Sequence, residues 1–324
     1  MMILDTMQHI GILGKSTLQK FMNNSKVLIL GANGMLGKMV SLYFASLNHF
    51  ELILTAKNKS SFLSDQLGND YEIFDVLNDD FQNFAKSIKP DVIINCIGRI
   101  KPTIDESNNI SISETININS FFPMEIQKYS VENNSRYFQI GTDCVFSGKD
   151  GNYDELGMSD AEDLYGKSKI VGEILGNNKS VIRSSIIGPE QGSGRSLLNW
   201  FLNNESNELS GYRNHLWNGV TTLNFAKVIN GLIINESNFF KLQHLIPSNT
   251  VTKSELLSLF KINFKSRIQI NEVDASEVIN RTLKTNNPEN NESLWINAGY
   301  KKIPTIQENI SELAESNFTK EILN

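Results

Sequence analysis

The stretch Lys26-Val27-Leu28-Ile29-Leu30-Gly31-Ala32-Asn33-Gly34-Met35-Leu36-Gly37 decides the fold of this chain. It begins with a short apolar run of the kind that forms a buried parallel strand. Residues 35–47, which start inside the stretch, have the spacing of apolar side chains that is typical of an amphipathic helix. A strand, a glycine-rich turn and a helix are therefore expected in direct succession.

The three glycines of this stretch have separate tasks in a dinucleotide-binding turn. Gly31 permits the tight turn, and Gly34 lets the backbone approach a pyrophosphate. Gly37 permits close packing of the helix on the strand, and the helix N-terminus then faces the phosphates. The spacing is G-x-x-G-x-x-G. Its place between a strand and a helix favours coenzyme binding over a turn without a ligand.

Further strand-like stretches alternate with helical ones along the chain. The expected strands cover residues 51–55, 71–76, 90–98, 136–142 and 180–184, and the expected helices cover 79–88, 114–133 and 221–234. This alternation predicts an α/β fold with a doubly wound parallel sheet of the Rossmann type and helices on both faces. Ligands of such sheets bind at the carboxyl ends of the strands.

Polar residues follow several of these strands. Asp75 is expected to accept hydrogen bonds from an adenine amino group, and Asn95 and Gly98 are expected beside the pyrophosphate. Thr142 follows the fifth strand and is expected near Tyr165. The alternative interpretation is that such residues only cap helices and form turns.

Tyr165 and Lys169 stand four residues apart in Tyr165-Gly166-Lys167-Ser168-Lys169. On a helix, a phenol and an ammonium with this spacing project from one face. The cation favours the phenolate of a group whose ordinary pKa is about 10, which predicts a proton donor usable near neutral pH. The spacing is common by chance, so its weight comes from the glycine turn that precedes it.

Composition argues against several other classes of function. The chain has 324 residues, 40% hydrophobic and 20% charged, which predicts one large or two modest folded domains. A net charge of −6, a pI near 5.4 and scattered lysines argue against nucleic acid or an anionic membrane as partner. Cys96, Cys144 and the four histidines lie far apart in the sequence, so we expect no metal site.

The N-terminal region carries no targeting signal that we can identify. No apolar run of roughly 18 residues occurs, and the features of a secretory signal are missing, so we expect a cytoplasmic protein. Residues 1–24 are expected to be an N-terminal extension, with Met22 as an alternative start. Within them Gly14-Lys15-Ser16 is similar to a P-loop, but His9 stands where the first glycine is required.

An ordered series of motifs resembles the extended short-chain dehydrogenase/reductases, and within them the dTDP-4-dehydrorhamnose reductase-like sugar-nucleotide reductases. The motifs are residues 31–37, 89–95, 117–119 with Pro123, 142–148, 165–169 with Gly172 and Glu173, and 182–185. With the order of elements, the resemblance predicts an NAD(P)-binding Rossmann domain from residues 25–187 and 220–244. A smaller substrate-binding domain is expected from residues 188–219 and 245–324.

The resemblance implies reduction of the 4-keto group of a nucleotide-diphosphate 6-deoxy sugar, in the synthesis of cell-surface polysaccharide or glycan precursors. Thr142 would hydrogen-bond the C4 carbonyl oxygen, Tyr165 would give it a proton, and Lys169 would hold the nicotinamide ribose and lower the tyrosine pKa. Hydride would come from the coenzyme. The expected coenzyme contacts are Gly31, Asn33, Gly34, Met35, Leu36, Lys57, Asp75, Val76, Asn95, Cys96, Ile97, Gly98, Asn119, Tyr165, Lys169 and Ser184.

The residues after the second strand bear on the choice of coenzyme. A site that prefers NAD usually has Asp or Glu there for the ribose 2′-hydroxyl, whereas this chain has Thr55-Ala56-Lys57-Asn58-Lys59-Ser60. Two lysines could meet a 2′-phosphate, which favours NADPH and leaves NADH as the alternative. The competing interpretation is a solvated lysine loop.

The expected substrate contacts lie after Thr142 and in the C-terminal third. They are Asp143, Cys144, Glu190, Arg195 and Arg213, with Arg281 as a further candidate for the diphosphate. Aromatic residues of 211–219 are expected against the nucleotide base. An amphipathic helix is expected within 188–204, where core packing is the favoured interpretation of Trp200.

Cys144 opens an alternative within the same resemblance. Dehydratases of this fold carry Asp and then Glu after the threonine, so Cys144 after Asp143 disfavours simple dehydration. Dehydrorhamnose-type reductases typically have tyrosine at this position. In the GDP-fucose synthase branch a cysteine there acts as base in a C3/C5 epimerisation, and histidine stands where Glu190 lies here. A bifunctional epimerase-reductase therefore stays open.

A second alternative is a non-catalytic NADP-binding regulatory subunit, because some relatives bind the coenzyme without catalysis. The joint presence of Thr142, Tyr165 and Lys169 argues for an enzyme. Homodimers are common on this fold, but no segment of the sequence decides between a monomer and a homodimer.

Overall fold

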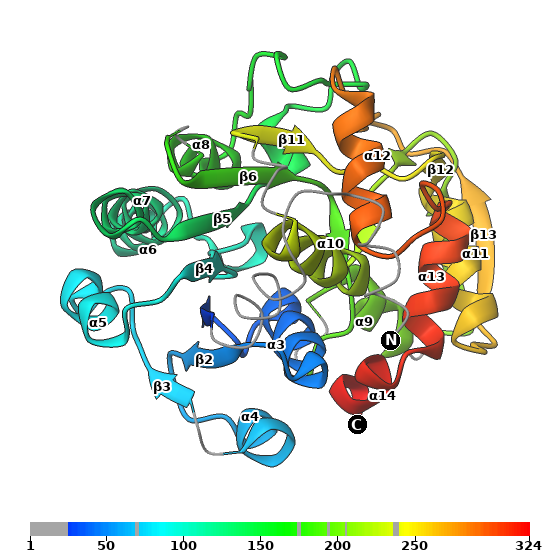
Figure 1. The fold of residues 1–324 in the computed structure, drawn as a ribbon. Helices are drawn as coiled ribbons and strands as arrows, with labels where there is room; N and C mark the ends of the chain where they lie inside the picture. The colour runs from blue at the N-terminus through cyan, green and yellow to red at the C-terminus, as the bar shows by residue number, and fades with distance from the viewer. Residues whose placement is uncertain (1–24, 69–70, 174–175, 193–194, 205, 236–239) are drawn as a thin grey trace.

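The computed structural model describes residues 25–68, 71–173, 176–192, 195–204, 206–235 and 240–324. Its centre is a seven-stranded sheet (Figure 1) with the strand order β11-β6-β5-β4-β1-β2-β3. Every pairing within this sheet is parallel. The strand order reverses between β1 and β4, the place at which open α/β sheets bind ligands. The predicted fold class is confirmed.

The strands of the sheet agree with the sequence to within a few residues at their ends, except for one edge strand. They are β1 (Lys26–Leu30), β2 (Glu51–Ala56), β3 (Tyr71–Ile73), β4 (Val92–Asn95), β5 (Arg136–Ile140), β6 (Lys179–Arg183) and β11 (Leu242–His244). The carboxylate of Asp75 accepts a hydrogen bond from the Leu77 amide, and Asn95 accepts one from Ile97 in the same way. These side-chain turns end β3 and β4 earlier than expected. The edge strand β11 was not predicted.

Helices cover both faces of the sheet (Figure 1), with α5 to α8 on one side and α3, α10 and α12 on the other. Their bounds are α3 (Met35–Leu47), α4 (Ser61–Leu67), α5 (Phe81–Ile88), α6 (Asn109–Ile116), α7 (Phe122–Asn133), α8 (Leu164–Gly172), α9 (Leu197–Leu202), α10 (Thr222–Ile234), α11 (Lys253–Asn263), α12 (Pro288–Asn297), α13 (Ile306–Glu315) and α14 (Asn317–Leu323). Among the described residues, no helix is long and apolar enough to span a bilayer.

Strand β1 shows why the central strands are apolar throughout. Val27 and Ile29 belong to the core shared with α3, α10 and the C-terminal helices, whereas Leu28 and Leu30 belong to the core on the other face. All four side chains are fully buried. Successive side chains of a strand point to opposite faces, so a strand between two helix layers has no solvent side.

Residues 109–133 form one helical stretch that changes its winding in the middle. Regular helices α6 and α7 flank the π-helical turn η2 (Asn117–Phe121). The stretch begins at Asn109, earlier than expected, because the Asn108 side chain caps it. This side chain accepts hydrogen bonds from the N–H groups of Ile110 and Ser111. Such π-turns are frequent at functional sites.

The C-terminal third adds small sheets and helices beside α3 and α10. Its strands are β7 (Ile186–Ile187), β8 (Glu208–Tyr212), β9 (Leu216–Trp217), β10 (Val220–Thr221), β12 (Val251–Thr252) and β13 (Gln269–Val273). Helix α9 buries Leu198 and Phe201, which lie three residues apart on one face. Trp200 lies outside that face and is 41% exposed, so the core-packing interpretation was wrong.

Candidate active site

The glycine turn between β1 and α3 is held by backbone contacts. Gly31 has a φ of +79°, in the left-handed region, and its N–H donates to the Thr55 hydroxyl at 3.2 Å. The Gly34 N–H donates to the Gly31 carbonyl at 3.0 Å. A β-carbon on Gly37 would lie 2.0 Å from that same carbonyl oxygen. The first and third glycines thus close the turn, as their spacing predicted.

The two lysines after β2 have different surroundings. The Lys57 ammonium lies 3.2 Å from a carboxylate oxygen of Asp75. Burial alone would raise the pKa of Asp75, but hydrogen bonds from Leu77 and Asn78 and the charge of Lys57 together lower it. Lys57 and Asp75, expected at different parts of a coenzyme, therefore bind each other.

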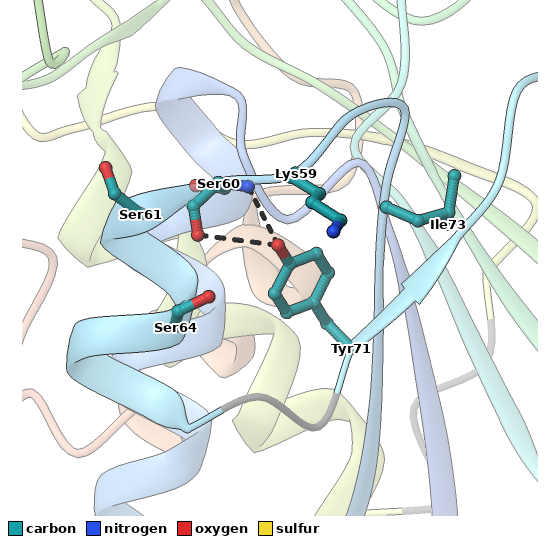
Figure 2. Close-up of a pocket in the computed structure, with 6 residues that line it drawn as sticks. All are labelled: Lys59, Ser60, Ser61, Ser64, Tyr71 and Ile73. Carbon is teal, nitrogen blue, oxygen red and sulfur yellow. Dashed lines mark hydrogen bonds between the residues drawn. The ribbon is translucent and has the colours of Figure 1, made fainter.

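Lys59 instead lines a cavity of about 450 Å³ at the beginning of α4 (Figure 2). The other lining residues are Ser60, Ser61, Ser64, Tyr71 and Ile73. The Ser60 N–H donates to the Tyr71 hydroxyl at 2.8 Å. The Ser60 hydroxyl donates to Asn33 at 2.8 Å, which ties this cavity to the glycine turn.

The two asparagines expected near the coenzyme are bound to protein groups. The Asn95 amide donates to Gln139 at 3.1 Å, and its oxygen accepts from the Ile97 N–H at 3.0 Å. Asn119, in the π-turn, accepts from the Arg99 N–H and donates to the Ser168 hydroxyl. Both asparagines are buried. Their direct contact with a coenzyme stays a prediction.

The other residues that the sequence placed at the coenzyme differ in exposure. Leu36 and Ser184 are buried, and the Ser184 hydroxyl donates to the Leu245 carbonyl at 2.9 Å. The remaining expected contacts are half-buried or exposed: Gly31, Asn33, Gly34, Met35, Val76, Cys96, Ile97 and Gly98. The Ile97 side chain packs where a β-carbon of Gly31 would stand.

Helix α8 is placed by a cap and by two glycines. The Asp163 carboxylate caps its start by accepting from the Gly166 N–H at 2.8 Å. A β-carbon on Gly166 would lie 2.4 Å from the Cys144 carbonyl oxygen, and one on Gly172 would lie 2.1 Å from that of Asn119. Only glycine permits so close an approach at both positions. The helix is therefore packed against the short helix after β5 on one side and the π-turn on the other.

This packing brings Thr142 and Tyr165 together. Thr142 follows β5, and its hydroxyl accepts from the Cys144 N–H at 3.1 Å as the cap of the short helix η3 (Asp143–Val145). The Thr142 hydroxyl also donates to Asp143 at 3.3 Å, and Thr142 lies close enough to Tyr165 to lower the pKa of the phenol. Burial raises the pKa of Tyr165, and the neighbouring Cys144 adds to this effect. The phenol therefore keeps its proton.

The Lys169 ammonium is hydrogen-bonded to the backbone in the structure. It donates to the Ile140 carbonyl at 2.8 Å. Burial lowers the pKa of Lys169, against the opposing effects of Glu173 and Cys96. Burial dominates at Tyr165 and raises its pKa, and the lowering expected from Lys169 stays a prediction.

A buried ion pair between Arg183 and Glu173 lies close to Lys169. The Arg183 guanidinium donates to Glu173 through two nitrogens, at 2.7 and 2.8 Å, and both side chains are less than a tenth exposed. Glu173 follows α8, and Arg183 ends β6. The pair ties the helix that carries Tyr165 and Lys169 to the central sheet.

Asp143 and Cys144 lie on the other side of Thr142 with two cations nearby. Burial raises the pKa of Asp143, and the charges of Lys253 and Arg281 oppose this effect. Burial and the Asp143 charge raise the pKa of Cys144 to about 12. Sequence reasoning missed Lys253. Thr252 and Glu255 form a capping box that marks the start of a helix there, but nothing local indicates which distant residues the lysine meets.

Three expected substrate contacts are engaged elsewhere or exposed. Glu190 accepts from the Ser196 N–H at 3.1 Å, and Arg213 forms an exposed ion pair with Asp274 at 2.7 Å. Arg195 is exposed. Across the described ranges, no hydrogen bond or ion pair connects these three side chains to Thr142 or Tyr165.

Comparisons with known proteins agree with this architecture. A sequence profile of the family described as the RmlD substrate binding domain matches residues 25–290. The methionine adenosyltransferase 2 subunit beta of Danio rerio is 28% identical over 150 residues, which are 46% of this chain and 42% of that protein. The chain thus matches less than half of the length of this curated relative.

Solved structures share the fold at low sequence identity. The dTDP-4-dehydrorhamnose reductase of Bacillus anthracis, in complex with NADP, has a TM-score of 0.70 and 19% identity, covering 90% of this chain and 98% of that chain. The UDP-glucuronic acid 4-epimerase of Bacillus cereus, in complex with NAD, has a TM-score of 0.66 and 13% identity, covering 90% and 96%. Because the family profile spans most of the sequence, the chain belongs to the RmlD substrate binding domain family, among the short-chain dehydrogenase/reductases that resemble dTDP-4-dehydrorhamnose reductase.

Proposed function

We propose that this protein is an NAD(P)H-dependent reductase of the 4-keto group of a nucleotide-diphosphate 6-deoxy sugar, acting in the synthesis of cell-surface polysaccharide or glycan precursors. The observation that carries the proposal is the close packing of the start of α8 on the segment after β5, which brings Tyr165 near Thr142. Lys169 lies one helical turn away and near Cys96, which follows the strand beside the glycine turn. The predicted division into coenzyme and substrate domains is part of this proposal.

The surroundings of Tyr165 suit a general acid. Because its pKa is raised, the phenol is neutral at pH 7 and has a proton to give. The Thr142 hydroxyl lies beside it, so two hydroxyl groups can hydrogen-bond one carbonyl oxygen and stabilise the charge that develops there. In this proposal Lys169 exchanges the Ile140 carbonyl for a ribose hydroxyl and orients the coenzyme.

The glycine turn fits a nicotinamide dinucleotide. A β-carbon on Gly34 would meet nothing closer than the Gly31 carbonyl oxygen at 3.5 Å, so the backbone there is open to a pyrophosphate. When bound, the reduced coenzyme supplies the hydride. The residues around it have to orient the ring against the carbonyl carbon and exclude water.

The surroundings of the two lysines support NADPH, with NADH as the alternative. Lys57 is paired with Asp75, whereas Lys59 faces a cavity that three serines also line. Hydroxyl groups and an ammonium suit a phosphate. We therefore assign the 2′-phosphate to Lys59 and not to Lys57, which had been expected from the sequence. A reductase of the same fold was solved with NADP.

The test is turnover of NADPH with a panel of 4-keto-6-deoxy nucleotide sugars, followed by loss of NADPH absorbance. Tyr165→Phe removes the proposed acid and is expected to lower kcat by roughly 100-fold to 10,000-fold, with unchanged coenzyme affinity. Tyr212→Phe is the matched control, because Tyr212 is an exposed tyrosine of β8. An active Tyr165→Phe enzyme would refute the assignment.

One observation favours a second candidate, a non-catalytic NADP-binding regulatory subunit. The curated relative from Danio rerio is described as a subunit beta, although it matches only part of its length. Tight coenzyme binding without turnover of any sugar nucleotide, in wild type and Tyr165→Phe alike, would favour this candidate.

A further inference from the structure

Tyr71 begins β3, the strand at one edge of the central sheet. It pairs in register with Leu54 of β2, close to the end of that strand at Ala56. The phenol is therefore placed beside the segment that follows β2, at the carboxyl end of the sheet where ligands bind. The reduction proposed above assigns no role to this residue.

The side chain of Tyr71 reaches into the cavity at the beginning of α4. Successive side chains of a strand alternate between its two faces, so Tyr71 and Ile73 lie on the same face of β3. Both line the cavity of about 450 Å³, together with Lys59 and the three serines. Figure 2 shows the phenol pointing across the cavity to Ser60. The edge strand thus adds a polar group to a cavity whose other polar groups come from residues 59–64.

The Tyr71 hydroxyl is well used as an acceptor but poorly used as a donor. Its oxygen accepts from the Ser60 N–H at 2.8 Å, which is an ordinary hydrogen-bond length. The phenol's own O–H reaches the Ser60 carbonyl only at 3.5 Å, where a hydrogen bond is weak. A tyrosine hydroxyl can accept and donate at the same time. The O–H can therefore turn to a ligand while the contact with the Ser60 N–H is kept.

The segment that carries Lys59 is held in place around this contact. The Ser60 hydroxyl donates to Asn33 of the glycine turn at 2.8 Å and accepts from the Leu63 N–H at 3.3 Å. Lys59, in contrast, is exposed, and its ammonium has no hydrogen bond or ion pair with any described residue. The backbone is fixed, whereas the ammonium that it carries has no partner among these residues.

The polar groups of the cavity suit a phosphate monoester. They are an ammonium and several hydroxyl groups, and no carboxylate is among the residues that line the cavity. A phosphate monoester carries a charge of roughly −1.5 to −2 at pH 7 and offers three strong acceptor oxygens. Donors to such a charged group form stronger hydrogen bonds than donors to a neutral group.

We propose that Tyr71 is a specificity-determining residue of the coenzyme site, whose hydroxyl holds the Ser60 N–H and donates its own proton to the 2′-phosphate of NADPH. The inference rests on the proposed function, which assigns this phosphate to Lys59. NADH has only a neutral hydroxyl at the same position, so it gains little from Tyr71. The tyrosine should therefore favour NADPH over NADH.

The experiment is isothermal titration of the full chain with NADP⁺ and with NAD⁺, which differ only in the 2′-phosphate. Tyr71→Phe keeps the ring and removes the hydroxyl. It is expected to weaken NADP⁺ roughly 5-fold to 15-fold and to leave NAD⁺ within about twofold. Unchanged NADP⁺ affinity overturns the inference. An equal loss for both coenzymes also overturns it, because Tyr71 would then only support the fold.

Tyr129→Phe is the matched control. Tyr129 belongs to α7, and its hydroxyl donates to the Ala85 carbonyl of α5 at 3.0 Å. This variant also loses one tyrosine hydrogen bond, but away from the cavity. Its melting temperature is expected to fall, and its ratio of NADP⁺ to NAD⁺ affinity should equal that of wild type. Melting temperatures of both variants identify damage to the fold.

The outcomes separate this inference from the proposed function. If wild type prefers NADP⁺ and Tyr71→Phe keeps the same preference, the inference alone fails. If wild type binds both coenzymes equally well, the NADPH assignment fails and the inference fails with it. If wild type binds neither coenzyme, the proposed function itself fails.

Discussion

The two sides of the site differ in how their polar groups are satisfied. On the coenzyme side, Asn95, Asn119 and Lys169 are buried and hydrogen-bonded to protein groups. On the substrate side, Lys253 and Arg281 have no carboxylate partner among the described residues. The buried polar groups of the first side therefore have partners within the chain, whereas the two cations of the second form no ion pair with a described residue.

The difference follows from how each side is built. The coenzyme side lies at the ends of neighbouring parallel strands, whose register fixes the positions of the residues. The substrate side joins Asp143, Lys253 and Arg281 through loops and the start of one helix. We therefore expect mutations of buried, paired groups to cost stability, and mutations of exposed groups that face a ligand to cost affinity.

The largest expected effect is on the buried ion pair behind Lys169. Glu173→Ala leaves Arg183 buried without its partner and should lower the free energy of unfolding by about 3–5 kcal/mol. Asp274→Ala removes the exposed partner of Arg213 and should cost about 0–1 kcal/mol. Urea denaturation measures both. Equal losses in the two variants would contradict the expected dependence of an ion pair's contribution on its burial.

Substitutions at two glycines of the coenzyme turn are expected to affect different properties, stability at one and coenzyme binding at the other. A β-carbon on Gly37 would collide with the Gly31 carbonyl oxygen, so Gly37→Ala should cost about 1–3 kcal/mol. The gain of roughly 1 kcal/mol from replacing a glycine inside a helix is too small to offset this. Gly34→Ala should leave stability within about 0.5 kcal/mol and weaken NADPH binding. Thermal melting and coenzyme titration distinguish the two, and normal NADPH affinity in Gly34→Ala would show that the turn does not meet the pyrophosphate.

The lysines after β2 test the coenzyme preference. Lys59→Ala should weaken NADPH by about 1 kcal/mol, or roughly fivefold, as is usual for an exposed charge, and leave NADH unchanged. Lys57→Ala should have a smaller effect on the NADPH to NADH ratio, because Lys57 is paired with Asp75. Fluorescence titration with both coenzymes decides between them. A larger effect at Lys57 would restore the assignment made from the sequence.

The smallest expected effect is at Cys144. Because its pKa is raised to about 12, the thiol is neutral at pH 7 and cannot serve as a ready base. An acid with a raised pKa ionises later as the pH rises, so alkylation by iodoacetamide should still be accelerating at about pH 10, where an ordinary thiol is already ionised. Cys144→Ser should change kcat less than about threefold. Solvent deuterium entering C3 or C5 in wild type, and lost in Cys144→Ser, would instead establish the epimerase alternative.

Sequence reasoning predicted the coenzyme side better than the substrate side. The strand, turn and helix of residues 26–47 depend on local periodicity and on glycine, so they could be placed almost to the residue. The contact of the Lys253 ammonium with the Trp217 ring depends on the pairing of β9 with β12, which no local pattern indicates. The raised pKa of Tyr165 depends on burial in the folded chain, which the spacing to Lys169 could not indicate.

The π-turn of residues 117–121 makes the length of its helix part of the catalytic geometry. A π-turn holds one residue more than regular α-helical winding, and this extra residue sits in the turn that hydrogen-bonds Ser168. Deleting one residue there would restore regular winding and leave the flanking turns of α6 and α7 close to their register. The wide turn that holds Asn119 against Arg99 and Ser168 would be lost, while the buried face of α7 would be kept.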